Sequence, residues 1–124
     1  MLTALQATTL SYLRRDGDAI AFWRMATART DELRARADAI AAKATAATVV
    51  DTEAVPGGGT LPGVTIPSVG LAVDGDHARA LRERDRPLIA RVAPAPDSMT
   101  IVDLRTIDSE DDGEVAAALA TIDP

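Results

Sequence analysis

Two arginines and an aspartate in the second half of the chain have the types and spacing to face a substrate together: Arg91, Asp103 and Arg105. Residues 87–93 and 99–107 are typical of two strands of a hairpin joined by a three-residue turn. That register puts the three charged side chains on one exposed face, and the opposite face carries an apolar set: Leu88, Ala90, Val92, Thr100, Val102 and Leu104. Strand arginines beside a carboxylate are costly to hold unless they contact something. We therefore predict that Arg91 and Arg105 bind substrate, with structural pairing to Asp103 as the alternative.

If Arg105 lies on an exposed strand, its replacement by alanine should cost little stability, under ~1 kcal/mol, as for an exposed ion pair.

A glycine-rich segment provides the second candidate feature. Three successive glycines after Pro56 let the backbone take positive φ or approach another surface closely, and a Leu-Pro pair then fixes an extended exit. Backbone N–H groups there could cradle a phosphate, but no lysine follows as a P-loop requires. We predict a structural loop near a domain junction, formed by Gly57, Gly58, Gly59 and Thr60.

The remaining candidates for chemistry are weak, and we predict neither catalytic residues nor a metal site. Lys43 is the single lysine and lies in an alanine-rich helical pattern, where nothing lowers its pKa for Schiff-base chemistry. The chain has no cysteine, and His77 is its one histidine. The acidic run at 108–113 resembles the start of a calcium loop, but Leu119 occupies the position that needs a glutamate. A solvated helix start is the favoured interpretation of that run.

The elements that must position these residues are alternating helices and strands of an α+β fold. Hydrophobic periodicity and capping residues predict a mainly antiparallel sheet with helices packed on one face. The expected helices are 2–15, 19–27, 30–46, 76–86 and one after 108, and the expected strands are 48–53, 68–73 and the hairpin. We divide the chain into a connecting helix with its anchor segment, residues 1–27, and a small α+β domain, residues 28–124.

Composition limits the classes of function. A chain of 124 residues with net charge −6 and pI about 4.6 does not suit a stand-alone nucleic-acid binder. A helical stripe of Arg79, Arg82 and Arg86 could face phosphates, but Glu83 and Asp85 interrupt it, which favours a solvated face. The sequence shows neither a signal peptide nor an apolar run of membrane-spanning length, so we expect a cytoplasmic protein with no membrane partner.

Six segments of the sequence resemble the C-terminal part of bacterial L-seryl-tRNA(Sec) selenium transferases, also called selenocysteine synthases. They are 3–8, 22–25, 31–36, the glycine-rich 56–63, 88–91 and the Asp-Leu-Arg region 101–105. The resemblance covers nearly the whole chain. It implies the small C-terminal domain of a fold type I pyridoxal-phosphate enzyme, with residues 1–27 as the end of the helix between large and small domains.

In that family the cofactor lysine lies upstream of everything in this chain. The resemblance therefore implies that pyridoxal phosphate is held by a missing upstream domain, that this chain carries no cofactor, and that the fragment alone is inactive. The implied partners of the complete enzyme are seryl-tRNA(Sec), selenophosphate and further copies of itself. Two alternatives stay open: a selenium-transferase-like pyridoxal-phosphate ammonia lyase, and a non-catalytic interaction domain.

Overall fold

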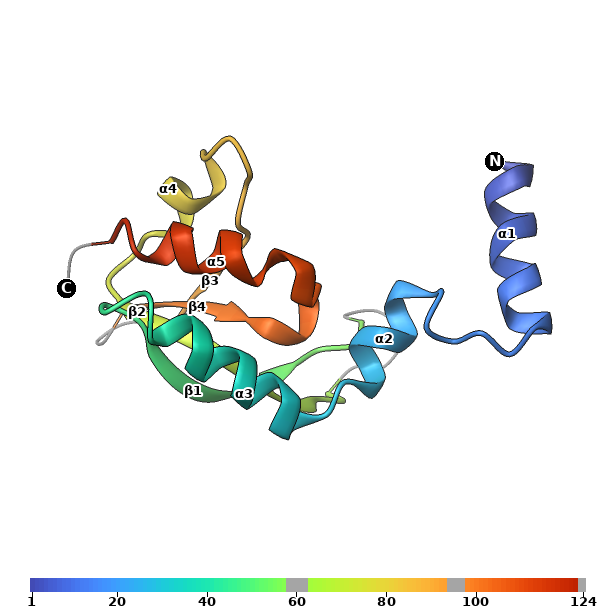
Figure 1. Cartoon of the computed structure of the whole chain (residues 1–124), viewed down its shortest axis with the longest axis horizontal. Helices are drawn as coiled ribbons and strands as arrows, with labels where there is room; N and C mark the ends of the chain where they lie inside the picture. The colour runs from blue at the N-terminus through green and yellow to red at the C-terminus, as the bar shows by residue number, and fades with distance from the viewer. Residues whose placement is uncertain (58–62, 94–97, 123–124) are drawn as a thin grey trace.

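The computed structural model describes residues 1–57, 63–93 and 98–122. Within them the chain forms an α+β fold of five α-helices, two short 3-10 helices and four strands (Figure 1). The α-helices are α1 (Leu2–Leu13), α2 (Ala21–Thr27), α3 (Thr30–Ala41), α4 (Ala78–Arg82) and α5 (Asp112–Leu119). The strands are β1 (Thr48–Ala54), β2 (Ile66–Asp74), β3 (Arg91–Val92) and β4 (Met99–Asp103), and the 3-10 helices are η1 (Leu104–Thr106) and η2 (Ser109–Asp111).

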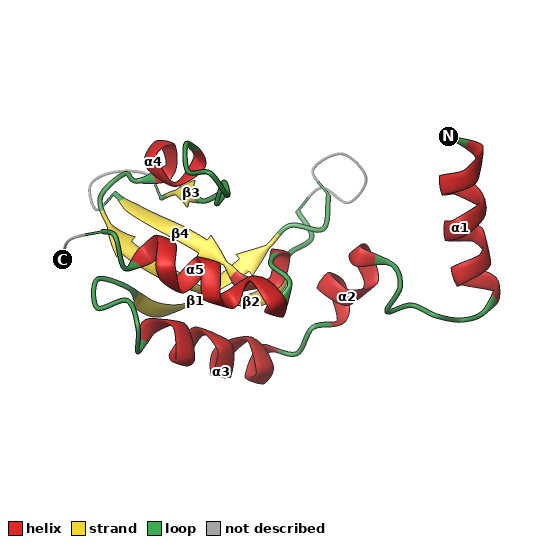
Figure 2. Ribbon diagram, turned by 45° about the horizontal axis from the view of Figure 1, so that its top comes forward, coloured by secondary structure: helices red, strands yellow, loops and turns green. Residues whose placement is uncertain are grey.

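The four strands form one antiparallel sheet in the order β1-β2-β4-β3. Helices α3 and α5 lie side by side on one face of this sheet (Figure 2). The predicted class, an antiparallel α+β fold with helices on one face, is confirmed.

The core is aliphatic and lies between the sheet and these two helices. Alternate residues of the central strand β2 point into it, and α3 contributes Leu33, Ala37 and Ile40 at helical spacing. The other fully buried large side chains include Leu71, Leu81, Val102, Leu104, Val115 and Leu119. Because successive residues of a strand point to opposite faces of the sheet, the apolar pattern fixes the register between strands.

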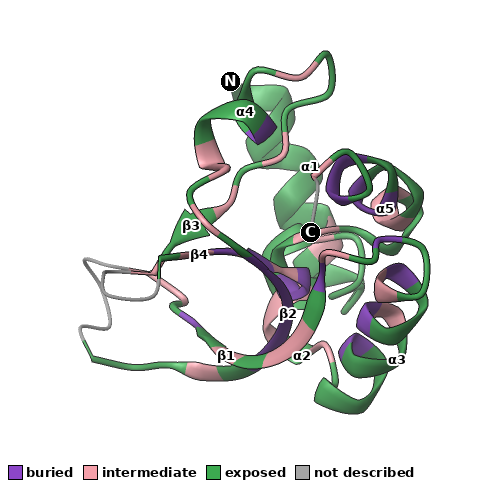
Figure 3. Cartoon of the chain, turned by 90° about the vertical axis from the view of Figure 1, so that its left-hand side faces the viewer, coloured by how far each residue is buried: buried purple, intermediate pink, exposed green. Residues whose placement is uncertain are grey.

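The sheet curls strongly, with α3 and α5 on its convex side (Figure 3). Ser68 and Ala72, on the concave side, are also buried. Gly70 lies between them, and a Cβ atom there would come within 2.5 Å of the main-chain oxygen of Val102. A glycine is therefore required at this position of β2, where the main chain of β4 leaves no room for a side chain.

Arg36 joins α3 to the C-terminal part of the domain. Its guanidinium donates to both carboxylate oxygens of Asp112, at 2.7 and 2.9 Å, and to the carbonyl oxygen of Ile107 at 2.9 Å. Both side chains of the pair are about four-fifths buried. This bidentate, partly buried pair holds α5 onto α3.

Helix α1 extends away from the α+β domain and has no buried residue (Figure 1). It ends at Leu13, two residues before the predicted boundary, and Arg15 adopts a positive φ of 57°. The indole nitrogen of Trp23 donates to the hydroxyl of Tyr12 at 3.1 Å and connects α1 with α2. The proposed division at residue 27 stays a prediction. In the described part of the chain, no helix has both the length and the apolar character needed to cross a bilayer.

Three more predicted elements besides α1 are shorter than expected. Helix α3 ends at Ala41, whereas the pattern predicted a helix to residue 46. Helix α4 covers Ala78–Arg82 of the predicted 76–86. The strand predicted over 87–93 is reduced to the two residues of β3. Pro87 has no N–H to donate, and the N–H of Leu88 bonds to the carbonyl of Leu81, so this segment is tied to α4 instead of the sheet.

The predicted hairpin register is confirmed where β3 and β4 pair. Arg91 lies opposite Ile101, and Val92 lies opposite Thr100. The predicted turn at 95–97 lies outside the described residues.

The strand predicted to reach residue 107 ends at Asp103, and this part of the prediction is wrong. The carboxylate of Asp103 accepts the backbone N–H of Arg105 at 3.0 Å and starts the 3-10 helix η1. An aspartate that bonds the backbone two residues ahead favours a turn over a continuing strand. Arg105 therefore does not lie on the sheet.

Candidate functional site

Arg91 is exposed and lies on the concave face of the sheet. It leaves the edge strand β3 and reaches β1 at the other edge, where it donates to the carbonyl oxygen of Glu53 at 3.0 Å and to the hydroxyl of Thr52. Both acceptors are uncharged groups, and Arg91 makes no ion pair within 4.0 Å among the described residues. Its charge therefore remains available to an anion at this face.

Asp103 does not pair with either arginine in the described part of the chain. Its carboxylate accepts the hydroxyl of Ser68 at 2.5 Å and the backbone N–H of Arg105. The structural alternative predicted for the two arginines, an ion pair with Asp103, is therefore wrong. Asp103 instead ends β4 and fixes the start of β2.

Arg105 is buried, whereas the sequence predicted an exposed side chain. Only 5% of the residue is accessible, and its guanidinium donates to main-chain oxygens of Met25 at 2.7 Å, Ala28 at 2.8 Å and Pro67 at 2.6 Å. The structure thus separates Arg91 from Arg105. With both terminal nitrogens bonded to carbonyls, Arg105 has a structural role, and its predicted part in substrate binding has no support from this geometry.

The glycine-rich loop connects β1 to β2, and its stems lie beside α2. Gly57 is half-buried at the end of the first stem, whereas Gly58, Gly59 and Thr60 lie outside the described residues. The stems and α2 enclose a cavity of about 100 Å³, lined by Phe22, Met25, Ala26, Ala54, Val55, Pro56, Ile66, Arg105 and Thr106. The role of the loop at a domain junction stays a prediction.

Lys43 lies in an exposed turn just after α3, not inside a helix as predicted. A Schiff-base lysine lies in a pocket that holds the cofactor ring. An exposed turn is not such a pocket, so Lys43 does not fit the lysine of a pyridoxal-phosphate site.

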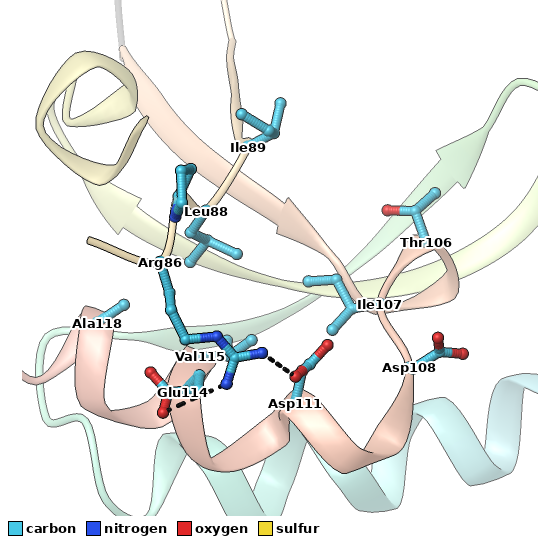
Figure 4. A pocket seen from close by; sticks show the side chains of 11 residues that line it. Arg86, Leu88, Ile89, Thr106, Ile107, Asp108, Asp111, Glu114, Val115 and Ala118 are labelled. Atoms are coloured by element: carbon cyan, nitrogen blue, oxygen red, sulfur yellow. Dashed lines mark hydrogen bonds and ion pairs between the residues drawn. The ribbon is translucent and has the colours of Figure 1, made fainter. Parts of the chain in front are cut away.

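The basic stripe is partly neutralised by neighbouring carboxylates. Arg79 pairs with Glu83 at 2.8 Å, and Arg86 pairs with Asp111 at 2.6 Å and Glu114 at 3.5 Å. Figure 4 shows Arg86 bonded to these two acids at the rim of a cavity of about 290 Å³ between residues 86–89 and α5. These pairs agree with the interpretation of the stripe as a solvated face.

The acidic run at 108–113 has a role that the sequence did not indicate. Three of its carboxylates pair with arginines of three different segments: Asp108 with Arg24, Asp111 with Arg86, and Asp112 with Arg36. Among the described residues no three His, Asp or Glu side chains are grouped to hold a metal ion. The run therefore connects the C-terminal helix to the rest of the chain.

One surface ion pair shifts two pKa values. The hydrogen bond from Arg29 holds the pKa of Asp31 below its ordinary value, and the same bond raises the pKa of Arg29. Both groups are exposed at the start of α3, where an acidic side chain also suits the helix dipole. This pair belongs to the helix terminus and not to the concave face.

Comparison with known proteins identifies the family. Residues 1–108, which include helices α1 to α4, the four strands and η1, match the family described as L-seryl-tRNA selenium transferase. No curated protein matches the chain. Because the match covers most of the 124 residues, the chain belongs to the L-seryl-tRNA selenium transferase family.

Proposed function

We propose that this chain serves as the C-terminal small domain of a selenium transferase that converts seryl-tRNA(Sec) to selenocysteinyl-tRNA(Sec) with selenophosphate. The family match over residues 1–108 carries the proposal. The antiparallel α+β architecture of the described residues also supports it, because the resemblance to fold type I enzymes implies a small domain of this class.

The cofactor belongs to another part of the enzyme in this proposal. Pyridoxal phosphate, when bound there, supplies an electron sink for removal of the serine hydroxyl. This chain would contribute a wall of the site and subunit contacts in a cytoplasmic homo-oligomer.

The chain alone should not form an aldimine with pyridoxal phosphate, because its single side-chain amine, Lys43, is exposed and lacks a pocket. Incubation with the cofactor, borohydride reduction and mass spectrometry measure the labelling. We expect no more adduct at Lys43 than at a lysine of an unrelated protein. Stoichiometric labelling of Lys43 would contradict the proposal that another part of the enzyme holds the cofactor.

Arg91 is the residue that we propose to face the substrate. A guanidinium with several donors suits the phosphate-type oxygens that both selenophosphate and tRNA carry. The neutral partners of Arg91, Thr52 and the Glu53 carbonyl, hold the side chain across the concave face without cancelling its charge.

In the complete enzyme, Arg91→Ala should lower kcat/KM about tenfold or more, since a hydrogen bond to a charged group contributes about 1.5–3 kcal/mol. Arg91→Lys should recover part of the loss by keeping the charge. Arg79→Ala is the matched control, because Arg79 is an exposed arginine on α4 that pairs with Glu83. Equal activity of Arg91→Ala and Arg79→Ala would exclude the role proposed for Arg91.

The isolated chain should bind tRNA weakly and with strong salt dependence. Its net charge of −6 opposes phosphates, and Arg79 and Arg86 are already paired with acids. A gel-shift titration at two salt concentrations measures this binding. Tight, specific binding at physiological salt would instead show that Arg79, Arg82 and Arg86 form a nucleic-acid-binding surface.

The reaction class is tested with the protein translated from the complete coding sequence that contains this chain. The purified protein is supplied in separate reactions with seryl-tRNA(Sec) plus selenophosphate and with an amino sugar acid. We expect selenocysteinyl-tRNA and no release of ammonia. Ammonia release would favour the lyase alternative, and inactivity with both substrates would favour an interaction domain.

A further inference from the structure

Helix α2 lies against the α+β domain with little apolar burial to fix its direction. None of its seven residues is buried, whereas the neighbouring α3 buries three. The surface between α2 and the ends of β1 and β2 contains the cavity of about 100 Å³ described above. Apolar contact of this kind tolerates tilting, because few tightly packed neighbours define one position.

The guanidinium of Arg105 supplies the missing constraint. Its Nη1 atom donates to oxygens of Met25 and Ala28 at 2.7 and 2.8 Å, and a longer contact of 3.4 Å reaches Ala26. These carbonyls lie in the last turn of α2 and just beyond it, where no further helical N–H groups follow. A cation at this end also suits the helix dipole. Its Nη2 atom donates to Pro67 at 2.6 Å, so the same side chain is bonded to β2.

A second arginine, which lies in α2 itself, makes an independent connection to the α+β domain. Arg24, within α2, donates to the carboxylate of Asp108 at 3.3 Å and to the carbonyl oxygen of Asp18 at 2.8 Å. Arg105 and Asp108 belong to the same short segment that follows β4. The guanidinium groups of Arg24 and Arg105 therefore both connect α2 to the segment that follows β4. Through its bond to Asp18, Arg24 also holds the residues that precede α2.

We infer that Arg105, assisted by the Arg24–Asp108 pair, sets the orientation of α2 on the α+β domain. The sheet and α2 then move as one body, and any segment attached before α2 keeps a defined direction relative to the sheet. Arg105 is a positioning residue in this view. Its effect is on the geometry of the folded protein and not only on the stability of the sheet.

The absence of cysteine in the chain makes a distance measurement straightforward. Spin labels are placed on the variant Ala21→Cys/Ala39→Cys, at exposed positions of α2 and α3, and the distance distribution is measured by pulsed electron resonance. The doubly labelled protein with Arg105 in place should give one narrow distance distribution. Arg105→Met should broaden it about twofold or more while the circular dichroism of the sheet is kept. Arg79→Met, an exposed arginine of α4, should leave it unchanged.

An unchanged distribution in a folded Arg105→Met variant would overturn the inference. If Arg105→Met fails to fold, Arg105→Lys decides the question. A lysine keeps the positive charge, but its single ammonium group cannot reach the oxygens of Met25, Ala28 and Pro67 together as the two terminal nitrogens of Arg105 do. A broader distance distribution in Arg105→Lys then supports the inference, and a distribution as narrow as that of the protein with Arg105 refutes it.

Discussion

Arg105→Ala should lower the free energy of unfolding by about 3 kcal/mol, because hydrogen bonds to a charged donor contribute about 1.5–3 kcal/mol each and several buried carbonyls lose their partner. The acceptors are the oxygens of Met25, Ala28 and Pro67, all within 2.8 Å of the guanidinium. A loss of this size is a large part of the total stability of a small domain, about 5–15 kcal/mol. Urea unfolding followed by circular dichroism measures it.

Arg79→Ala is the control for Arg105→Ala. Arg79 is also an arginine, but its side chain is 87% exposed and pairs with Glu83 on the same helix. Its removal should change stability by no more than about 0.5 kcal/mol. If both variants lost equally little unfolding free energy, Arg105 would be exposed, as the sequence predicted.

Gly70→Ala should destabilise the chain by about 2–3 kcal/mol, as expected for overpacking a filled interior. The new Cβ atom would lie 2.5 Å from the main-chain oxygen of Val102, and a paired strand cannot move aside as a flexible side chain can. Unfolding in urea should show a lower midpoint with an unchanged slope.

Gly113→Ala provides the matched control with the opposite sign. Gly113 lies in the first turn of α5, and no atom comes within 4 Å of its added Cβ. Alanine there should stabilise the helix by up to about 1 kcal/mol. A Gly70→Ala variant as stable as the parent would show that β2 and β4 are not held as closely as described.

The sequence predicted the antiparallel sheet and the pairing of Arg91 with Ile101 because both follow from local alternation. A register shift by one residue would have turned Val102 out of the core, so the apolar pattern alone selected the observed pairing. The same pattern placed Arg91 on the face away from the helices.

The errors came from residues whose side chains bond to distant or local backbone groups. Asp103 ended β4 through a bond to the N–H two residues ahead, and this moved Arg105 off the sheet and into the interior. The strand propensity of residues 101–107, which are rich in β-branched side chains, favoured a strand that continues beyond Asp103.

The polar connections between distant segments carried no local signal. Arg36 and Asp112 are 76 residues apart in sequence, and Arg24 and Asp108 are 84 apart. Only the folded topology brings these partners together, since neither residue type nor spacing distinguishes them from solvated charges. For this reason the sequence alone favours a solvated helix start for the acidic run at 108–113.

The central claim, that this chain is the small domain of a selenium transferase, is tested most directly by grafting. The C-terminal domain of a characterised L-seryl-tRNA selenium transferase is replaced by this chain, and formation of selenocysteinyl-tRNA from seryl-tRNA(Sec) and selenophosphate is measured. The same enzyme without its C-terminal domain is the reference. We predict that the graft restores selenocysteinyl-tRNA formation well above this reference; a correctly folded graft with no more activity than the truncated enzyme would contradict the account.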